Sequence, residues 1–261
     1  MEGIDLTCLM PAMREAGAAI MQVKSAGVTA DYKADASPVT AADHASEAIL
    51  KAALAAHFPD IPVISEEYAD SHLLRPSECY FLVDPLDGTR EFLREDSNGN
   101  FTVNIGFVQG GIACGGLIYV PAMDWLCWTD TDFKAHQERV GQQSSLKIRD
   151  VPQAGAAALA SRSHRDAMTD AFLRAEDITD IVLAGSSLKF LLLAEGTADI
   201  YPRFGPTMEW DTAAGEAILR AAGGHVLASD GTPHRYGKKG WRNSAFIACA
   251  GYHPSFPLPD L

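Results

Sequence analysis

The chain has 261 residues, 47% of them hydrophobic and 21% charged, which is typical of a globular protein large enough to bury a substantial core. Its formal net charge of −13 argues against a nucleic-acid-binding protein, which would normally carry a basic face. The same charge would repel an anionic ligand, so a site for such a ligand would need local cations.

The five cysteines are scattered, and three of them lie in apolar segments that favour buried thiols. This pattern fits a reducing compartment, and the N-terminus lacks the features of a signal peptide, so we expect a cytoplasmic protein. The apolar run at residues 110–120 is too short to span a bilayer, and no stable membrane insertion is expected. A peripheral position on the cytoplasmic face of the inner membrane and a homodimer both stay open.

At the start of the chain, an apolar stripe at helical spacing predicts a helix over residues 4–26. Residues 28–36 are polar and are expected to be extended or to form a hairpin. Thr40 is a plausible N-cap for a second helix that ends at His57. Asp43 would complete a capping-box pattern, so it has a structural explanation of its own.

Two short apolar runs then predict strands, and carboxylates follow each of them. Residues 61–65 are followed by Glu66 and Glu67. Residues 79–83 are expected to end at a turn that carries Asp84 and Asp87. An Asp-Pro-x-Asp-Gly string of this kind is also an ordinary surface turn.

The residues around these aspartates would make the turn stiff and suited to a ligand. Pro85 fixes its own φ and biases the residue before it toward an extended conformation. Gly88 lets the backbone pass close to a ligand, and Thr89 adds a hydroxyl. Hard carboxylate oxygens held in this way suit Mg²⁺, completed by water and a substrate phosphate.

The rest of the chain indicates an antiparallel meander followed by alternating strands and helices. After a charged loop at 93–99, strands are predicted at residues 101–108, 112–120, 124–131, 157–161, 181–184, 199–201 and 246–250, the last of which closes the sheet. Helices are predicted at 165–175 and 188–195. The polar stretch 132–155 has no predicted element and is the best candidate for a seam between halves at 1–150 and 151–261. The order suits an α+β fold, a layered αβαβα sandwich.

A further helix is predicted after Trp210 and Asp211, and it ends at Gly223-Gly224. Asp211 could be that helix's N-cap, and a helix N-terminus also attracts phosphate. Three separate segments thus each place a carboxylate at the edge of an element, which is how a multi-metal phosphate site is assembled.

These three segments resemble the signatures of the inositol monophosphatase superfamily, at residues 65–67, 84–89 and 210–215. Further stretches narrow the resemblance to the bacterial 3'(2'),5'-bisphosphate nucleotidase branch, the CysQ type; they lie at residues 37–43, 101–105, 161–164, 185–190 and 201–209. Together they cover the chain from roughly residue 37 to 250. The resemblance implies a Mg²⁺-dependent, lithium-sensitive phosphatase with the layered sandwich fold.

The resemblance also implies roles for single residues. The metal ligands, for two or three Mg²⁺, would be Glu66, Asp84, Asp87, Asp211 and the Leu86 carbonyl. Asp43 would lie at the metal site, where it or a neighbouring carboxylate orients Thr89 to position or deprotonate the attacking water. The Gly88 and Thr89 amides would cradle the phosphate. Glu67 and His44 are expected to lie outside the ligand set.

For the substrate, the resemblance implies that the loops at 161–164 and 185–189 bind a nucleotide. The expected contacts are Ser163, His164, Ser187, Lys189 and Asp211, most of which could instead be cap or turn residues. The implied reaction converts adenosine 3',5'-bisphosphate (PAP) to AMP and phosphate and clears a by-product of sulfate assimilation. Activity on 3'-phosphoadenylyl sulfate stays open. Arg90 stands where this branch commonly has lysine, which changes the geometry of any phosphate contact.

Two alternatives remain. An inositol monophosphatase or a broad sugar phosphatase would share every metal ligand, and the relative activity on PAP and on inositol 1-phosphate separates it from a nucleotidase. A non-catalytic Mg²⁺-binding or regulatory protein could keep the same fold.

Overall fold

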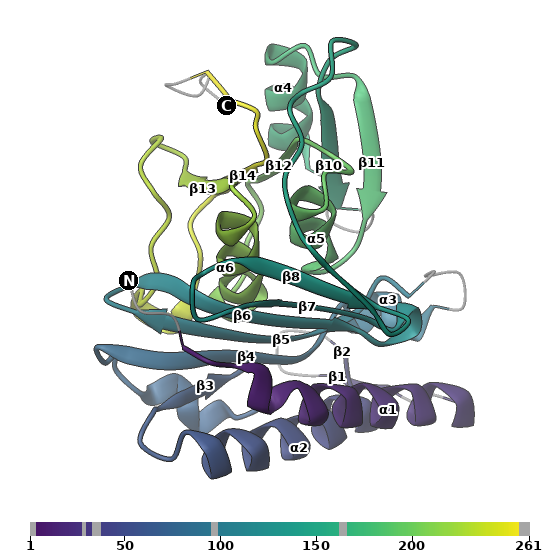
Figure 1. The fold of residues 1–261 in the computed structure, drawn as a ribbon, viewed down its shortest axis with the longest axis vertical. Coiled ribbons are helices and arrows are strands. Elements are labelled where there is room, and N and C mark those ends of the chain that lie inside the picture. Colours follow the sequence, from purple (N-terminus) through teal and green to yellow (C-terminus); the bar gives the residue numbers. More distant parts are fainter. Residues whose placement is uncertain (1–3, 28–29, 33–37, 95–98, 162–165, 256–261) are drawn as a thin grey trace.

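The structure is a computed structural model that describes residues 4–27, 30–32, 38–94, 99–161 and 166–255. Its helices and sheets alternate in five layers (Figure 1). The predicted α+β fold, a layered αβαβα sandwich, is confirmed. Within the described residues, no helix combines the length and the apolar character that crossing a membrane requires.

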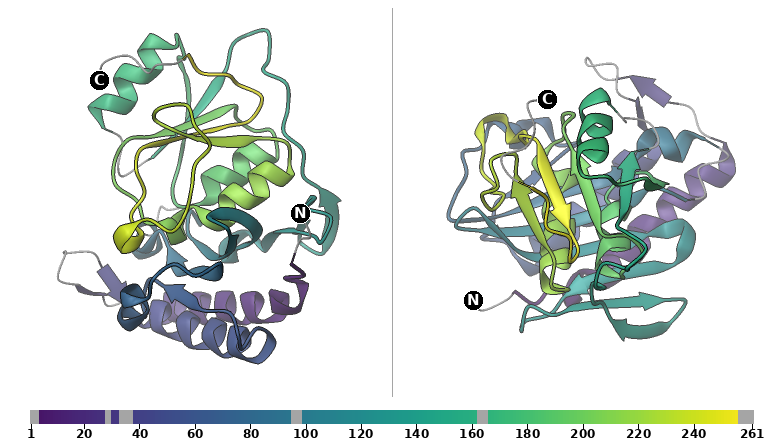
Figure 2. Two further views of the ribbon diagram at one scale, coloured as in Figure 1. Left: turned by 90° about the vertical axis from the view of Figure 1, so that its left-hand side faces the viewer. Right: turned by 90° about the horizontal axis from the view of Figure 1, so that it is seen from above.

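The first layer consists of two long helices that lie side by side on one face of the larger sheet (Figures 1 and 2). α1 spans Met10–Ala26 after the turn η1, Thr7–Leu9, so helical structure begins three residues later than predicted. α2 spans Ala41–His57, as predicted, with Thr40 as its N-cap and Asp43 completing the capping box. β1 (Ala30–Tyr32) pairs antiparallel with β2 (Pro38–Thr40).

The second layer is a seven-stranded sheet in the order β3-β4-β5-β6-β7-β8-β9. Its strands are β3 (Val63–Ser65), β4 (Cys79–Asp87), β5 (Thr102–Gln109), β6 (Ile112–Val120), β7 (Trp125–Thr129), β8 (Ala135–Arg139) and β9 (Gln142–Ser145). β3 and β4 are parallel, and the remaining pairs form the predicted antiparallel meander. β8 and β9 lie in the stretch that had no predicted element. β9 is exposed along its whole length, so it lacks the apolar alternation that reveals a strand.

The fourth layer is a five-stranded sheet in the order β11-β10-β12-β14-β13. Its strands are β10 (Ala157–Ser161), β11 (Asp180–Ala184), β12 (Ile200–Arg203), β13 (His225–Ala228) and β14 (Phe246–Cys249). The predicted last strand, β14, does not close the sheet, because it pairs with β12 on one side and with β13 on the other. β13 was not predicted.

Helices fill the space between the two sheets and cover the outer face of the smaller one. α5 (Leu188–Ala194) and α6 (Ala213–Ala221) pack between the sheets, and α4 (Ala167–Ala175) lies outside. Glycine permits the close approach of α6, because a Cβ at Gly116 would lie 2.3 Å from the Ala214 carbonyl oxygen. The remaining short helices are η2 (Ala69–Leu73), α3 (Thr89–Leu93), η3 (Pro121–Met123), η4 (Glu209–Asp211) and η5 (Lys239–Trp241).

The two sheets come from successive parts of the chain, but they share one hydrophobic core. Ile118 of the larger sheet, Leu159 of the smaller one and Ile218 of α6 belong to the same buried cluster. We therefore propose to describe the molecule as two closely packed halves, residues 1–150 and 151–261.

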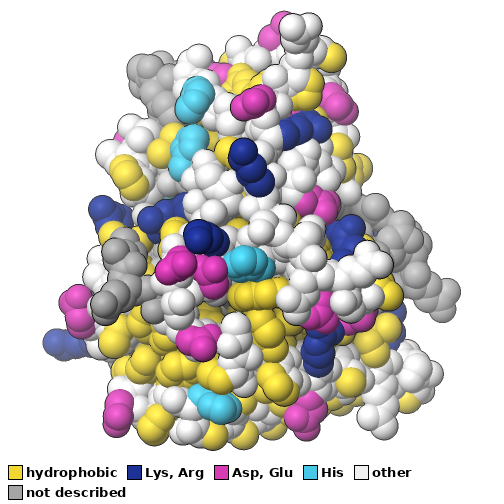
Figure 3. All heavy atoms as spheres, in the orientation of Figure 1, with side chains coloured by type: hydrophobic (Ala, Val, Ile, Leu, Met, Phe, Trp, Pro, Cys, Tyr) yellow, Lys and Arg dark blue, Asp and Glu magenta, His cyan; other side chains and the backbone are white. Residues whose placement is uncertain are grey.

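Two features of composition can be followed in the structure. Cys114, Cys127 and Cys249 are buried free thiols, as predicted for three of the five cysteines. On the face shown in Figure 3, Lys and Arg side chains of the described residues are scattered among acidic ones and form no basic patch.

Candidate metal centre and active-site cleft

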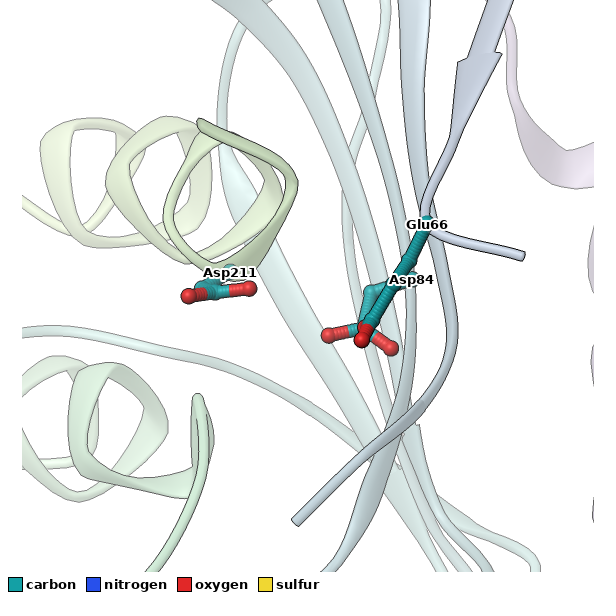
Figure 4. Close-up of side chains that lie close together, drawn as sticks. All are labelled: Glu66, Asp84 and Asp211. Atoms are coloured by element: carbon teal, nitrogen blue, oxygen red, sulfur yellow. The ribbon is translucent and has the colours of Figure 1, made fainter. Parts of the chain in front are cut away.

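Three carboxylates that are far apart in the sequence meet at one point. Glu66 follows β3, Asp84 lies in β4, and Asp211 ends η4 in front of α6. One carboxylate oxygen from each lies within 4.8 Å of the others. Figure 4 shows Asp211 on the helix side of the group, facing Glu66 and Asp84 on the strand side. The predicted acidic edges therefore do come together, in a geometry that fits a metal ion.

A cation would compensate the negative charges at this point. Burial raises the pKa of Asp84 well above its usual value, and repulsion from Glu66 and Asp87 raises it further. The pKa of Asp211 is raised in the same way. Burial raises the pKa of Asp87 to about 7, although Lys189 opposes this shift. Because burial and mutual repulsion disfavour the ionised carboxylates, the donor set fits a divalent cation that would compensate them.

The sequence predicted that this strand ends at Val83, but β4 continues to Asp87. Its pairing with β5 is regular up to Asp84 and shifts register before Asp87. Pro85 lies inside this irregularity, and it has no N–H with which to continue the ladder. Its carbonyl accepts a hydrogen bond from Ser46 of α2 at 2.7 Å. The interpretation as an ordinary surface turn is wrong, because Asp84 is 1% exposed.

Thr89 lies beside the aspartates, at the start of α3, and contacts Asp43. Gly88 precedes it in the left-handed conformation, with φ 89°. The Thr89 hydroxyl lies 3.3 Å from one carboxylate oxygen of Asp43, and the other oxygen accepts from the Thr40 amide and hydroxyl. Asp43 is therefore both the capping-box residue of α2 and a partner of Thr89. Burial raises the pKa of Asp43, and the two hydrogen bonds from Thr40 oppose the shift.

A cleft of about 720 Å³ opens over the acidic group. Its walls come from both halves of the chain and include Thr89, Ser161, Asp166, Lys189, Arg203 and Arg242. A volume of this size is in the range of sites for small organic ligands. The predicted residues Gly88, Leu86 and Asp87 also line it, as does Arg90.

The predicted substrate residues occupy different positions. Ser163 and His164 lie outside the described residues. Ser187 is 2% exposed. Its backbone amide donates to Asp87, and its hydroxyl donates to the side-chain oxygen of Asn104 at 2.6 Å. The Lys189 ammonium is buried, donates to the Ser186 carbonyl at 2.6 Å and has its pKa lowered to about 8, chiefly by burial. In this structure Ser187 and Lys189 support Asp87, and their role as substrate contacts stays a prediction.

Asp211 is held by the turn in which it lies. Thr212, not Asp211, occupies the N-cap position of α6, so the alternative that Asp211 is only the N-cap of this helix is wrong. The Asp211 carboxylate accepts from the Met208 amide at 2.8 Å, and the Met208 carbonyl accepts from the Asn243 side chain at 2.7 Å. A segment about thirty residues downstream thus fixes this metal-ligand candidate.

A second contact to the same segment involves Glu209, a residue that the sequence analysis did not assign to the site. Its carboxylate is completely buried and accepts from the Gly237 amide at 2.8 Å and from the Lys238 amide and ammonium, both at 2.9 Å. Residues this far apart, in irregular segments, leave no periodic pattern in the sequence, so no local signal could have revealed the pair.

The comparison with known proteins agrees with this geometry. A model of the inositol monophosphatase family matches residues 5–253. The chain belongs to this family. A 3'(2'),5'-bisphosphate nucleotidase CysQ of Escherichia coli O157:H7 is 43% identical over 236 residues, which cover 89% of this chain and 93% of that protein. The protein of the same name from Buchnera aphidicola is 42% identical over 254 residues, covering 95% and 93%.

Solved structures of the inositol monophosphatase family share the fold. CysQ from Bacteroides thetaiotaomicron superposes with a TM-score of 0.77 at 36% identity, over 94% of this chain and 97% of that chain. An inositol monophosphatase from Anabaena gives a TM-score of 0.72 at 27% identity, over 94% and 89%. Enzymes of the inositol monophosphatase family are metal-dependent, which accords with the acidic group at the floor of the cleft.

Proposed function

We propose that this protein is a 3'(2'),5'-bisphosphate nucleotidase that removes the 3'-phosphate of PAP to give AMP and phosphate, in the cytoplasm and as part of sulfate assimilation. The observation that carries the proposal is the acidic group at the floor of a nucleotide-sized cleft, in a chain 43% identical over most of its length to a nucleotidase of this name. 3'-Phosphoadenylyl sulfate, which has the same 3'-phosphate, is a second candidate substrate.

The residues that would hold the metal are Glu66, Asp84, Asp87, Asp211 and the Leu86 carbonyl. All are hard oxygen donors, which favours Mg²⁺, and the number of carboxylates suits two or three ions. When bound, Mg²⁺ would supply the positive charge that activates a water molecule and neutralises charge developing on the phosphate.

The chain's own groups would place the water and the phosphate. The Thr89 hydroxyl has a buried carboxylate acceptor in Asp43, so a water molecule on its open side could be held in one orientation. The Gly88 and Thr89 amides lie at the same corner of the cleft and could donate to phosphate oxygens. Asp43 and Thr89 are thus the proposed catalytic pair, and Glu66 completes the set from the metal side.

Replacing Thr89 with alanine is expected to lower kcat for PAP by about 10²-fold, because the hydroxyl that orients the water is lost. KM should change much less, since the metal and the other phosphate contacts remain. Initial-rate kinetics measure both constants. Thr89→Ser is the matched control and should keep most of the activity. A Thr89→Ala variant with the parent's kcat would remove Thr89 from the mechanism.

The identity of the product tests the proposed function directly. PAP is incubated with the enzyme and Mg²⁺, and the nucleotide product is separated by ion-exchange chromatography. We expect 5'-AMP, because the proposed reaction requires the 3'-phosphate to lie over the metal centre. Accumulation of 3'-AMP would show that the other phosphate is removed, and intact PAP would contradict the proposal altogether.

A further inference from the structure

Arg242 lines the cleft, but the reaction proposed above gives it no role. It is exposed, and among the described residues its side chain has no hydrogen-bond or ion-pair partner. The other cationic side chains of the cleft are less accessible or lie elsewhere than Arg242. Lys189 and Arg203 are only 4% and 9% exposed, and Arg90 follows Thr89 on the metal side. Arg242 is therefore a cation available at the open side of the cleft.

The backbone of Arg242 is held rigidly by its two neighbours. Trp241 is 1% exposed and its indole N–H donates to the His72 carbonyl at 3.1 Å. Asn243 is 7% exposed, and its backbone N–H donates to the Thr207 carbonyl at 2.9 Å. Arg242 itself is extended, with φ −97° and ψ 131°. With buried residues on both sides of it, the exposed Arg242 side chain lies at the surface, where it lines the cleft.

The same backbone links Arg242 to the metal centre. Arg242 forms an isolated antiparallel bridge with Met208, whose amide donates to the carboxylate of Asp211. Arg242 and Asp211 are thus both connected to Met208, Arg242 through its backbone and Asp211 through its carboxylate. The fold therefore fixes the position of the Arg242 backbone relative to the acidic group.

We propose that Arg242 binds the phosphate of the substrate that is not hydrolysed and so selects bisphosphates over monophosphate esters. The inference rests on the proposed nucleotidase function. A planar guanidinium can donate two parallel hydrogen bonds to a phosphate. In a protein with a net charge of −13, a cation at the mouth of the cleft also offsets repulsion of a substrate with two phosphates.

The test compares Arg242→Gln with the parent enzyme. We expect KM for PAP to rise about tenfold with little change in kcat, because losing one charge-assisted hydrogen bond typically weakens binding by about that factor. Inhibition by 5'-AMP, which carries only the non-hydrolysed phosphate, should weaken by a similar factor. Inhibition by inorganic phosphate, which would bind mainly at the metal centre, should weaken much less than inhibition by 5'-AMP. Raising the salt concentration should reduce the difference between the two enzymes.

Arg235→Gln is the matched control, because Arg235 is an exposed arginine of the same C-terminal segment that does not line the cleft. It should leave all three constants unchanged. If the parent hydrolyses PAP but Arg242→Gln keeps its KM and its 5'-AMP inhibition, the Arg242 inference is wrong and the proposed function stands. If the parent does not hydrolyse PAP, the proposed function fails and the inference falls with it.

Discussion

Replacing Asp84 with asparagine is expected to lower kcat for PAP by about 10³-fold or more, because the removed charge lies at the centre of the acidic group. Asp84 is buried, and its neighbours Glu66, Asp87 and Asp211 belong to the proposed ligand set themselves, so none of them is a spare carboxylate that could replace it. The asparagine side chain can still accept the hydrogen bond that the Leu86 amide donates to Asp84 at 3.1 Å, so β4 should keep its shape.

Thermal unfolding separates this loss from misfolding. Without metal, Asp84→Asn should have a Tm equal to or above the parent's, since a buried group that repels its neighbours becomes neutral. With Mg²⁺ added, the parent's Tm should rise and the variant's should not. Asp132→Asn, at a carboxylate that is 75% exposed, is the control and should behave like the parent in both conditions. A variant that retains both turnover and the Mg²⁺-induced rise would exclude Asp84 from the metal site.

Replacing Glu209 with alanine should lower the free energy of unfolding by about 2–4 kcal/mol, because a fully buried carboxylate that accepts three hydrogen bonds is removed. The change would leave the partly buried amides of Gly237 and Lys238 without this acceptor. The Lys238 ammonium, whose side chain is 28% exposed, would also lose its carboxylate partner. The turn that carries Asp211 should loosen as a result.

Urea denaturation of the two proteins without metal measures this effect. The same Asp132→Asn variant serves as control, because its ion pair with Lys134 is exposed on both sides and should contribute less than about 1 kcal/mol. If Glu209→Ala costs no more than the control, the contact between η4 and the downstream segment does not stabilise the fold.

Elements with a strong local pattern were predictable from the sequence. Thr40 and Asp43 lie three residues apart, and the helix they cap begins and ends as predicted. The hairpin of β5 and β6 has two glycines at its turn, both with positive φ. The sequence placed Glu66, Asp84 and Asp211 at the edges of such elements, and in the structure these three carboxylates lie together. Their role as metal ligands stays a prediction.

What the sequence did not reveal depends on tertiary contacts. The polar strand β9 forms only because β8 offers it an edge. The extension of β4 through Asp84 depends on pairing with β5. Lys189 looked like a phosphate contact, but its burial beside Asp87 becomes visible only when α5 packs between the sheets. Arg242 has no distinguishing pattern, and only the fold brings it to the cleft.

The central claim is that this metal centre acts on a nucleotide with two phosphates. The most direct test is phosphate release from PAP and from inositol 1-phosphate, measured side by side with Mg²⁺ present and with Mg²⁺ chelated. We predict turnover that requires Mg²⁺ and strongly favours PAP. Preference for the inositol ester would keep the metal centre but contradict the nucleotidase assignment, and release that persists after chelation would contradict the metal centre itself.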